Sequence, residues 1–195
     1  MSIPKEPSVS RVDVVRHREA LLAAAADELA RNPEASMADV AQAAELTRAT
    51  LYRHFSSRQS LLKAIQGEAL SRASAILLEC RLDEGSALEV LRRVIDSLSK
   101  YGMRFRIILM RGPETNAHFS TQRDLVFAPL LDVVRRGQRE GDIQQDLSPE
   151  WVVSAMSSLL MTAVRSLPVI EKSEIAMAEL VYKTLVGGIA SRDAR

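Results

Sequence analysis

The stretch from residue 36 to residue 62 constrains the fold of this chain most, because it has the pattern of two short helices joined by a tight turn. It reads SMADVAQAAELTRATLYRHFSSRQSLL. Val40, Ala41 and Ala44 have the spacing of one helix face. Ser36 precedes that helix, and its hydroxyl is suited to accept a hydrogen bond from an N–H of the first turn. The first short helix therefore has both an apolar face and a start signal.

The second short helix begins after Thr47, another hydroxyl residue suited to cap a helix. Leu46 and Leu51 have the spacing of a hydrophobic staple, and Leu51 and Phe55 are four residues apart and face inward. A helix this short does not persist alone in water, so neighbouring elements must hold it. The pattern is typical of a helix-turn-helix, whose second helix enters the major groove of DNA by its N-terminal end. The residues expected to point outward from this helix are Arg48, Ala49, Tyr52 and Arg53.

The charges around the second helix are all of one sign. Between Thr47 and Lys63 the ionised side chains are those of Arg48, Arg53, Arg58 and Lys63, with no carboxylate among them. A surface that neutralises phosphates gains free energy from counterion release, so this strip favours DNA binding. A solvated helix face is the alternative for any isolated run of charge, but here the run coincides with two capped helices.

At these residues the chain resembles the TetR family of transcriptional regulators. The segment TLYRHFSSRQSLL, preceded by VAQAAELTRA, is similar to the signature of that family. The turn departs from the usual Ala-Gly-Val, because Glu45 stands where glycine would relieve a left-handed backbone position. Either Glu45 is modestly strained or the turn differs slightly from that of the family. Arg58 replaces the commoner lysine and adds a planar fork of donors. The residues that match the family pattern are Thr50, Leu51, Tyr52, His54, Phe55, Arg58, Leu61 and Leu62.

The resemblance implies roles for individual residues in binding DNA. It implies phosphate contacts for Ser36, Thr47, Tyr52 and His54, with Arg58 at the start of the following helix. For His54, packing beside Phe55 is the alternative to a phosphate contact. Arg48, Ala49 and Arg53 are expected at base edges, since arginine pairs with guanine and an alanine methyl can contact thymine.

The remaining pattern predicts an all-α chain of about nine helices. We expect a helix-turn-helix domain over residues 1–56, with a short N-terminal arm, and a larger helical ligand-binding and dimerisation domain over 57–195. One long helix is shared by the two domains without a Gly/Pro linker. Pro129 is expected to kink the helix in which it lies. Besides the two short helices, the expected helices are 12–30, 58–80, 86–101, 103–111, 116–140, 149–166 and 173–191.

Composition excludes several classes of protein. The chain of 195 residues has a net charge of +1, so a DNA-binding surface must be a local patch. No stretch is apolar enough to span a membrane, and no secretory signal is recognisable. Cys80 is the single cysteine, which fits a reducing cytoplasm and a buried thiol.

The sequence offers little for catalysis. The histidines are scattered, without the spacing of metal ligands, and no nucleophile or phosphate-binding motif is present. We therefore expect no enzyme, no metal and no cofactor. The predicted function is that of a sequence-specific, ligand-responsive DNA-binding regulator, a repressor released from a palindromic operator by a small molecule. The alternative is a helical ligand-binding protein or enzyme whose helix-turn-helix is non-functional.

A small-molecule effector is expected to bind inside the C-terminal domain. Methionines and aromatic residues at helical spacing can form either a pocket or an ordinary core. Arg104, Arg106 and Arg111 lie nearby in sequence; if buried they would favour an anionic ligand, but surface exposure is the alternative. The candidate pocket residues are Tyr101, Met103, Phe105, Met110, His118, Phe119 and Trp151.

The last two long helices are expected to form a homodimer interface. Each has an apolar face, and two such faces per chain suit a four-helix bundle about a two-fold axis. The alternative is that both faces are buried only against their own chain. The candidate interface residues are Val152, Ala155, Met156, Leu159, Leu160, Ala163, Val181 and Leu185.

Overall fold

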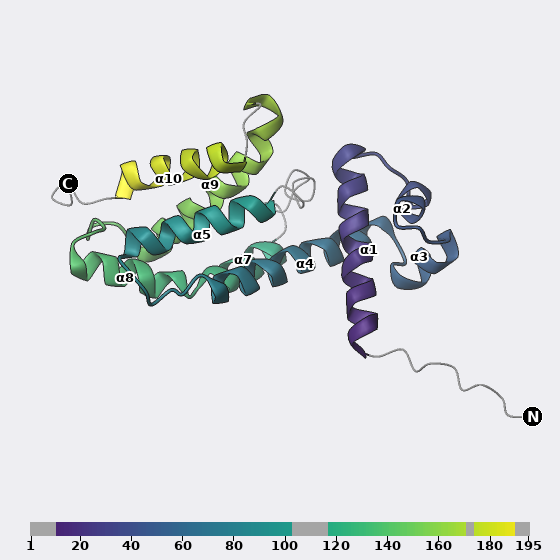
Figure 1. Cartoon of the computed structure of the whole chain (residues 1–195), viewed down its shortest axis with the longest axis horizontal. Helices are drawn as coiled ribbons and strands as arrows, with labels where there is room; N and C mark the ends of the chain where they lie inside the picture. Colours follow the sequence, from purple (N-terminus) through teal and green to yellow (C-terminus); the bar gives the residue numbers. More distant parts are fainter. Residues whose placement is uncertain (1–10, 103–116, 171–173, 190–195) are drawn as a thin grey trace, which may run out of the picture. The chain divides into compact units, whose positions relative to one another are not determined.

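The computed structural model describes residues 11–102, 117–170 and 174–189 of the chain (Figure 1). Within these ranges the chain forms nine α-helices and no β-strand, which confirms the predicted all-α class. The predicted helix over 103–111 lies outside the described residues. The chain divides into two compact units, the first ending at Glu68 and the second beginning at Ala69.

The first unit contains three helices and the start of a fourth. These are α1 (Arg11–Arg31), α2 (Met37–Ala43), α3 (Arg48–His54) and the first turns of α4 (Arg58–Glu79). Helix α2 packs against both α1 and α3. Side chains from all four helices are fully buried in this unit: Leu22, Leu29, Val40, Leu51, Leu61 and Ile65.

Helix α4 is continuous across the division between the units. Leu61 and Ile65, in its first turns, are 0% exposed, and Leu77, near its end, belongs to the core of the second unit. The division between the two compact units therefore lies inside α4, between Glu68 and Ala69.

The second unit contains five further helices. They are α5 (Ala87–Gly102), α7 (Ala117–Phe127), α8 (Leu130–Glu140), α9 (Pro149–Ile170) and α10 (Glu174–Ile189). Helix α10 packs against α5 and α9, and α8 also packs against these two helices (Figure 1). The largest fully buried side chains of this core are Leu91, Ile95, Leu130, Ile143 and Met156.

The prediction of a single kinked helix over 116–140 was wrong, because the chain breaks there into α7 and α8. Helix α7 ends at Phe127 and α8 begins at Leu130. At the junction the N–H of Ala128 donates to the carbonyl of Leu125, 3.3 Å away, in a tight turn. Pro129 has no N–H to continue an α-helical ladder, so the helix is interrupted and not merely bent.

Two arginines hold the turn after α4 in the second unit. From α5, Arg93 donates through Nε to the carbonyl of Cys80 (3.2 Å) and through Nη2 to that of Arg81 (2.9 Å). From α8, Nη2 of Arg136 lies 3.2 Å from the carbonyl of Leu82. The C-terminal end of α4 is thereby fixed to the bundle. Cys80 is a buried free thiol, as predicted.

Candidate nucleic-acid interface and internal cavity

The first short helix of the candidate interface begins with a complete capping box. The hydroxyl of Ser36 accepts from the N–H of Asp39 (3.3 Å), and the Asp39 carboxylate accepts from the N–H of Ser36 (2.7 Å). These reciprocal bonds satisfy two donors that would otherwise lack partners. The pKa of the Asp39 carboxyl is held below its usual value, mainly by the hydrogen bond from the Ser36 backbone N–H and to a smaller extent by the one from the Ser36 hydroxyl. Ser36 is exposed, so it caps α2 at the surface.

The turn between α2 and α3 contains a left-handed residue. Glu45 has a φ of 55°, a region that favours glycine. The following N–H, that of Leu46, donates to the carbonyl of Ala41 over 2.8 Å and closes the turn. Glu45, which stands where the family usually has glycine, therefore adopts the left-handed conformation of that position and is strained there.

Helix α3 is capped and anchored as predicted. The hydroxyl of Thr47 accepts from the N–H of Thr50 at 3.1 Å. Leu51 is 0% exposed and Phe55 is 5% exposed, so both lie against the rest of the first unit. The opposite side of the helix is accessible, and its exposed residues are Arg48, Ala49, Tyr52, Arg53 and His54. The structure thus brings these five predicted contact residues together on one exposed surface, with Thr47 at its N-terminal end.

His54 lies beside Phe55 and is also exposed. The two ring centroids are 6.3 Å apart and the rings are tilted by 43°. Both readings of the sequence, packing on Phe55 and contact with a phosphate, are compatible with this placement.

Arg58 makes contacts that the sequence analysis did not anticipate. Its Nη2 donates to the carbonyl of Pro33 at 2.7 Å, and its Nη1 donates to the carbonyl of Ala35. Both acceptors lie in the loop between α1 and α2, and Arg58 is half-buried there. Because its two terminal nitrogens serve carbonyls within the unit, Arg58 links the start of α4 to this loop and does not present a free phosphate-binding fork.

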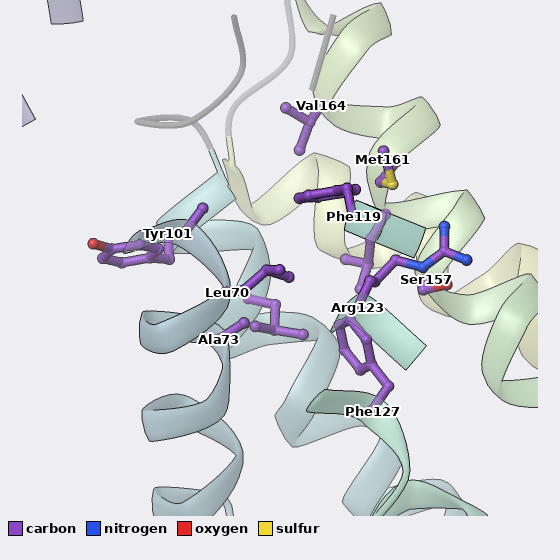
Figure 2. A pocket seen from close by; sticks show the side chains of 12 residues that line it. Leu70, Ala73, Tyr101, Phe119, Arg123, Phe127, Ser157, Met161 and Val164 are labelled. Atoms are coloured by element: carbon purple, nitrogen blue, oxygen red, sulfur yellow. The ribbon is translucent and has the colours of Figure 1, made fainter. Parts of the chain in front are cut away.

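The second unit encloses a cavity of about 100 Å³ between α4, α5, α7 and α9. Figure 2 shows side chains from the four helices around it, with Phe119, Arg123 and Phe127 of α7 facing residues of α4 and α9. Its lining residues are Ala69, Leu70, Ala73, Leu98, Tyr101, Phe119, Arg123, Phe127, Ser157, Leu160, Met161 and Val164.

The predicted pocket residues divide into three groups. Tyr101 and Phe119 line the cavity. His118 and Trp151 do not; both are exposed, Trp151 by 65%, because it lies on the outer side of the first turn of α9. The other predicted residues lie outside the described part of the chain: Met103, Phe105, Met110 and the neighbouring Arg104, Arg106 and Arg111.

Arg123 is a cavity residue that the sequence analysis missed. Phe119, Arg123 and Phe127 are spaced four residues apart on α7 and so share one face of the helix. That spacing was visible in the sequence, where an arginine between two phenylalanines on a buried face could have been recognised.

Most of the predicted interface residues are buried by their own chain. Their exposed fractions do not exceed 8%, and all contribute to the core of the second unit: Val152, Met156, Leu160, Ala163, Val181 and Leu185. These six are thus buried within their own chain, and a homodimer interface on α9 and α10 stays a prediction. Ala155 and Leu159 are only partly buried. Among the side chains of α9 and α10 that the structure describes, the large apolar ones that are exposed are those of Trp151 and Leu180, the latter 42% exposed.

Neither a metal centre nor a membrane span is found in the described residues. In the ranges that the structure covers, no three His, Cys, Asp or Glu side chains are grouped so that they could hold a metal ion. None of the described helices is long and apolar enough to cross a membrane.

Comparison with known proteins agrees with the helix-turn-helix geometry. Residues 21–65 match the family described as "Bacterial regulatory proteins, tetR family". The chain is 27% identical over 150 residues to the HTH-type transcriptional repressor LfrR of Mycolicibacterium smegmatis, covering 74% of this chain and 76% of the relative. It is 25% identical over 138 residues to the HTH-type transcriptional regulator NfxB of Pseudomonas aeruginosa, covering 69% and 74%.

The fold is also that of a solved structure. The crystal structure of LfrR from Mycobacterium smegmatis in complex with proflavine superposes with a TM-score of 0.74, at 22% identity, over 91% of this chain and 98% of that one. At this identity the likeness concerns the fold alone.

Proposed function

Because the chain belongs to the TetR family and is a DNA-binding transcriptional regulator, not an enzyme, we propose that it is a ligand-responsive repressor. In this proposal a homodimer binds a palindromic operator, and a small molecule in the cavity of the second unit releases it. The observation that carries the proposal is the exposed surface of α3, which groups Arg48, Ala49, Tyr52, Arg53 and His54 over a fully buried Leu51.

The exposed residues of α3 fall into two groups, those suited to contact base edges and those suited to contact phosphates. Arg48 and Arg53 can each donate two hydrogen bonds to the O6 and N7 atoms of a guanine, and the methyl of Ala49 suits a thymine methyl. Tyr52 and His54 provide hydroxyl and imidazole groups for phosphates, together with Thr47 and Ser36 at the helix N-termini. Arg58 acts indirectly: by binding the carbonyls of Pro33 and Ala35 it positions the helix-turn-helix against α4.

A dimer is needed for two recognition helices to enter successive major grooves, about 34–36 Å apart. We propose that the outward sides of α9 and α10 form the interface, with Leu180 of α10 and Ala155 and Leu159 of α9 in contact with the second copy. These residues keep accessible surface, whereas the inward sides of both helices are already buried. The operator should accordingly be a near-palindrome.

Release would proceed through α4. Three cavity residues, Ala69, Leu70 and Ala73, belong to this helix, whose first residue is Arg58. A ligand that displaces α4 at the cavity would move its N-terminal end, and with it the helix-turn-helix that Arg58 holds. A shift of an ångström or two suffices, because both recognition helices must fit grooves at a fixed spacing. The name of LfrR describes a repressor, and LfrR has been solved with proflavine; these are properties of that relative.

The proposal can be tested by selecting bound duplexes from a random library with the purified full chain. We expect enrichment of a near-palindromic site, bound by a dimer, with an affinity that falls steeply with salt. A matched scrambled duplex serves as the control. A protein that enriches no sequence, and binds the selected and scrambled duplexes alike, would contradict the proposal.

A further inference from the structure

The wall of the cavity is apolar except at one charged side chain. Among the described residues that line it, Arg123 carries the only charge and Tyr101 and Ser157 have the only hydroxyl groups, and the Tyr101 hydroxyl points away from the other lining side chains (Figure 2). The hydroxyl of Ser157 donates to the carbonyl of Ser154, 3.0 Å away, so its proton is already used. Arg123 is therefore the strongest available donor toward a ligand.

The guanidinium of Arg123 has a single partner in the described part of the chain. Its Nε and Nη2 lie 3.1 and 2.9 Å from Oδ1 of Asp124. The Arg123 side chain is 17% exposed, whereas that of Asp124 is 65% exposed. The pair is thus formed by a largely buried cation and a solvated carboxylate, and an ion pair that is open to water on one side is weak. Nη1 of Arg123 donates to no described residue.

From this geometry we infer that the cavity takes the apolar part of a carboxylate ligand, whose carboxylate binds Arg123. The inference rests on the proposed function of the cavity as the effector site, and it names the chemical class of the effector. A planar guanidinium matches a carboxylate in geometry, and charge-assisted hydrogen bonds in a poorly solvated site are the stronger ones. A cationic head group would be repelled by Arg123, and a neutral one would gain only ordinary hydrogen bonds.

A neighbouring cavity of about 320 Å³ shares Phe127 and Ser157 with the first cavity and is lined by Asp124 and Glu150. Asp124 is the partner of Arg123 (2.9 Å), and Glu150 (3.3 Å) shares Arg135 with Asp132 (3.0 Å). Hexylamine in the test below therefore measures whether these carboxylates attract a cation more strongly than Arg123 attracts a carboxylate.

The test compares ligands that differ only in their head group. Hexanoate, hexanamide and hexylamine, together with benzoate and benzamide, are titrated into the full chain by isothermal titration calorimetry. We expect each carboxylate to bind about 10–100-fold more tightly than its amide, and hexylamine to bind least tightly. Equal affinities for carboxylate and amide, or no measurable binding of either carboxylate at millimolar concentration, would overturn the inference.

Two variants change carboxylate binding in opposite directions: Arg123→Gln should weaken it and Asp124→Asn should strengthen it. Arg123→Gln should also abolish the preference for carboxylate over amide. The control is Arg139→Gln, the same change at an exposed position of α8 outside the cavity, which should keep that preference. Asp124→Asn removes the competing carboxylate and should tighten hexanoate binding several-fold. If Arg123→Gln fails to fold, Asp124→Asn decides: unchanged or weaker hexanoate binding contradicts a carboxylate site at Arg123.

Operator titration separates this inference from the proposed function. Carboxylates that bind through Arg123 but leave operator affinity unchanged would support the ligand class and contradict the effector role. A neutral or cationic compound that releases the operator from the same cavity, while carboxylates do not bind, would support the effector role and overturn the ligand class.

Discussion

Nη2 of Arg58, the first residue of α4, donates a hydrogen bond of 2.7 Å to the carbonyl oxygen of Pro33, in the loop between α1 and α2. Nη1 of the same guanidinium donates to the carbonyl of Ala35, which directly precedes the cap of α2. One side chain thus joins the long helix to the segment that leads into the helix-turn-helix. This role differs from the phosphate contact that the family resemblance implied, and it leads to the first prediction.

Arg58→Ala should weaken binding to all DNA sequences without changing the salt dependence. Loss of the two hydrogen bonds removes a donor from each of the carbonyls of Pro33 and Ala35 and should lower the free energy of unfolding by about 1–2 kcal/mol. Fluorescence anisotropy at several salt concentrations, with urea unfolding, measures both effects. Lys63→Ala is the comparison for loss of charge alone, because it removes the same charge from an exposed position of α4 in the same positive strip. A salt slope lower by about 0.9 in Arg58→Ala would instead assign a phosphate contact to Arg58.

Arg53→Ala should reduce sequence preference. The side chain is exposed on α3, next to Tyr52 and one turn after Ala49. If it reads a base, its loss should weaken binding to the selected operator by about 1–3 kcal/mol and leave binding to a scrambled duplex nearly unchanged. Equal losses on both duplexes would show that Arg53 contacts the DNA backbone.

Glu45→Gly should stabilise the turn between α2 and α3. Glu45 has a φ of 55°, where a Cβ is unfavourable, and glycine relieves that strain at some expense in unfolded-state entropy. We expect a net gain of about 0.5 kcal/mol in the free energy of unfolding, measured by urea denaturation. Gln42→Gly, at an exposed position inside α2, should instead destabilise by about 1 kcal/mol. The same sign for both variants would mean that backbone strain at Glu45 is negligible.

Leu180→Asp should dissociate the proposed dimer without unfolding the chain. Leu180 is 42% exposed, so an aspartate is tolerated in the monomer but would be buried without a partner in the interface. Leu185→Asp, on the same helix but only 2% exposed, should unfold the second unit. Sedimentation velocity gives the oligomeric state, and thermal unfolding monitors the fold. A Leu180→Asp protein that sediments as a dimer would place the interface elsewhere.

The helix-turn-helix was predictable because its determinants act over a few residues. Ser36 and Thr47 cap the helices that follow them, and Leu51 and Phe55 face inward, as their types and spacing indicated. At Glu45, comparison with the usual glycine left open whether the residue is strained or the turn differs, and the structure gives it a φ of 55°. At Pro129, by contrast, the sequence indicated a disturbance of the helix but not that the helix would end.

The surface that buries the inward faces of α9 and α10 could not be predicted from such short-range patterns. An apolar stripe at helical spacing indicates burial but does not indicate which surface buries it. The structure places Val152 and Met156 in the core of the second unit, and the surface that a second copy would use remains a proposal.

From sequence alone, therefore, came the all-α class, the caps, the exposed face of α3 and the resemblance to the TetR family. The three-dimensional arrangement was needed to find the partners of Arg58 and Arg123. Arg58 binds carbonyls 23 and 25 residues earlier in the chain, and Arg123 lines a cavity together with side chains of three other helices. A sequence shows that an arginine carries charge and five donors. Which acceptors those donors meet depends on segments that only folding brings within hydrogen-bond distance.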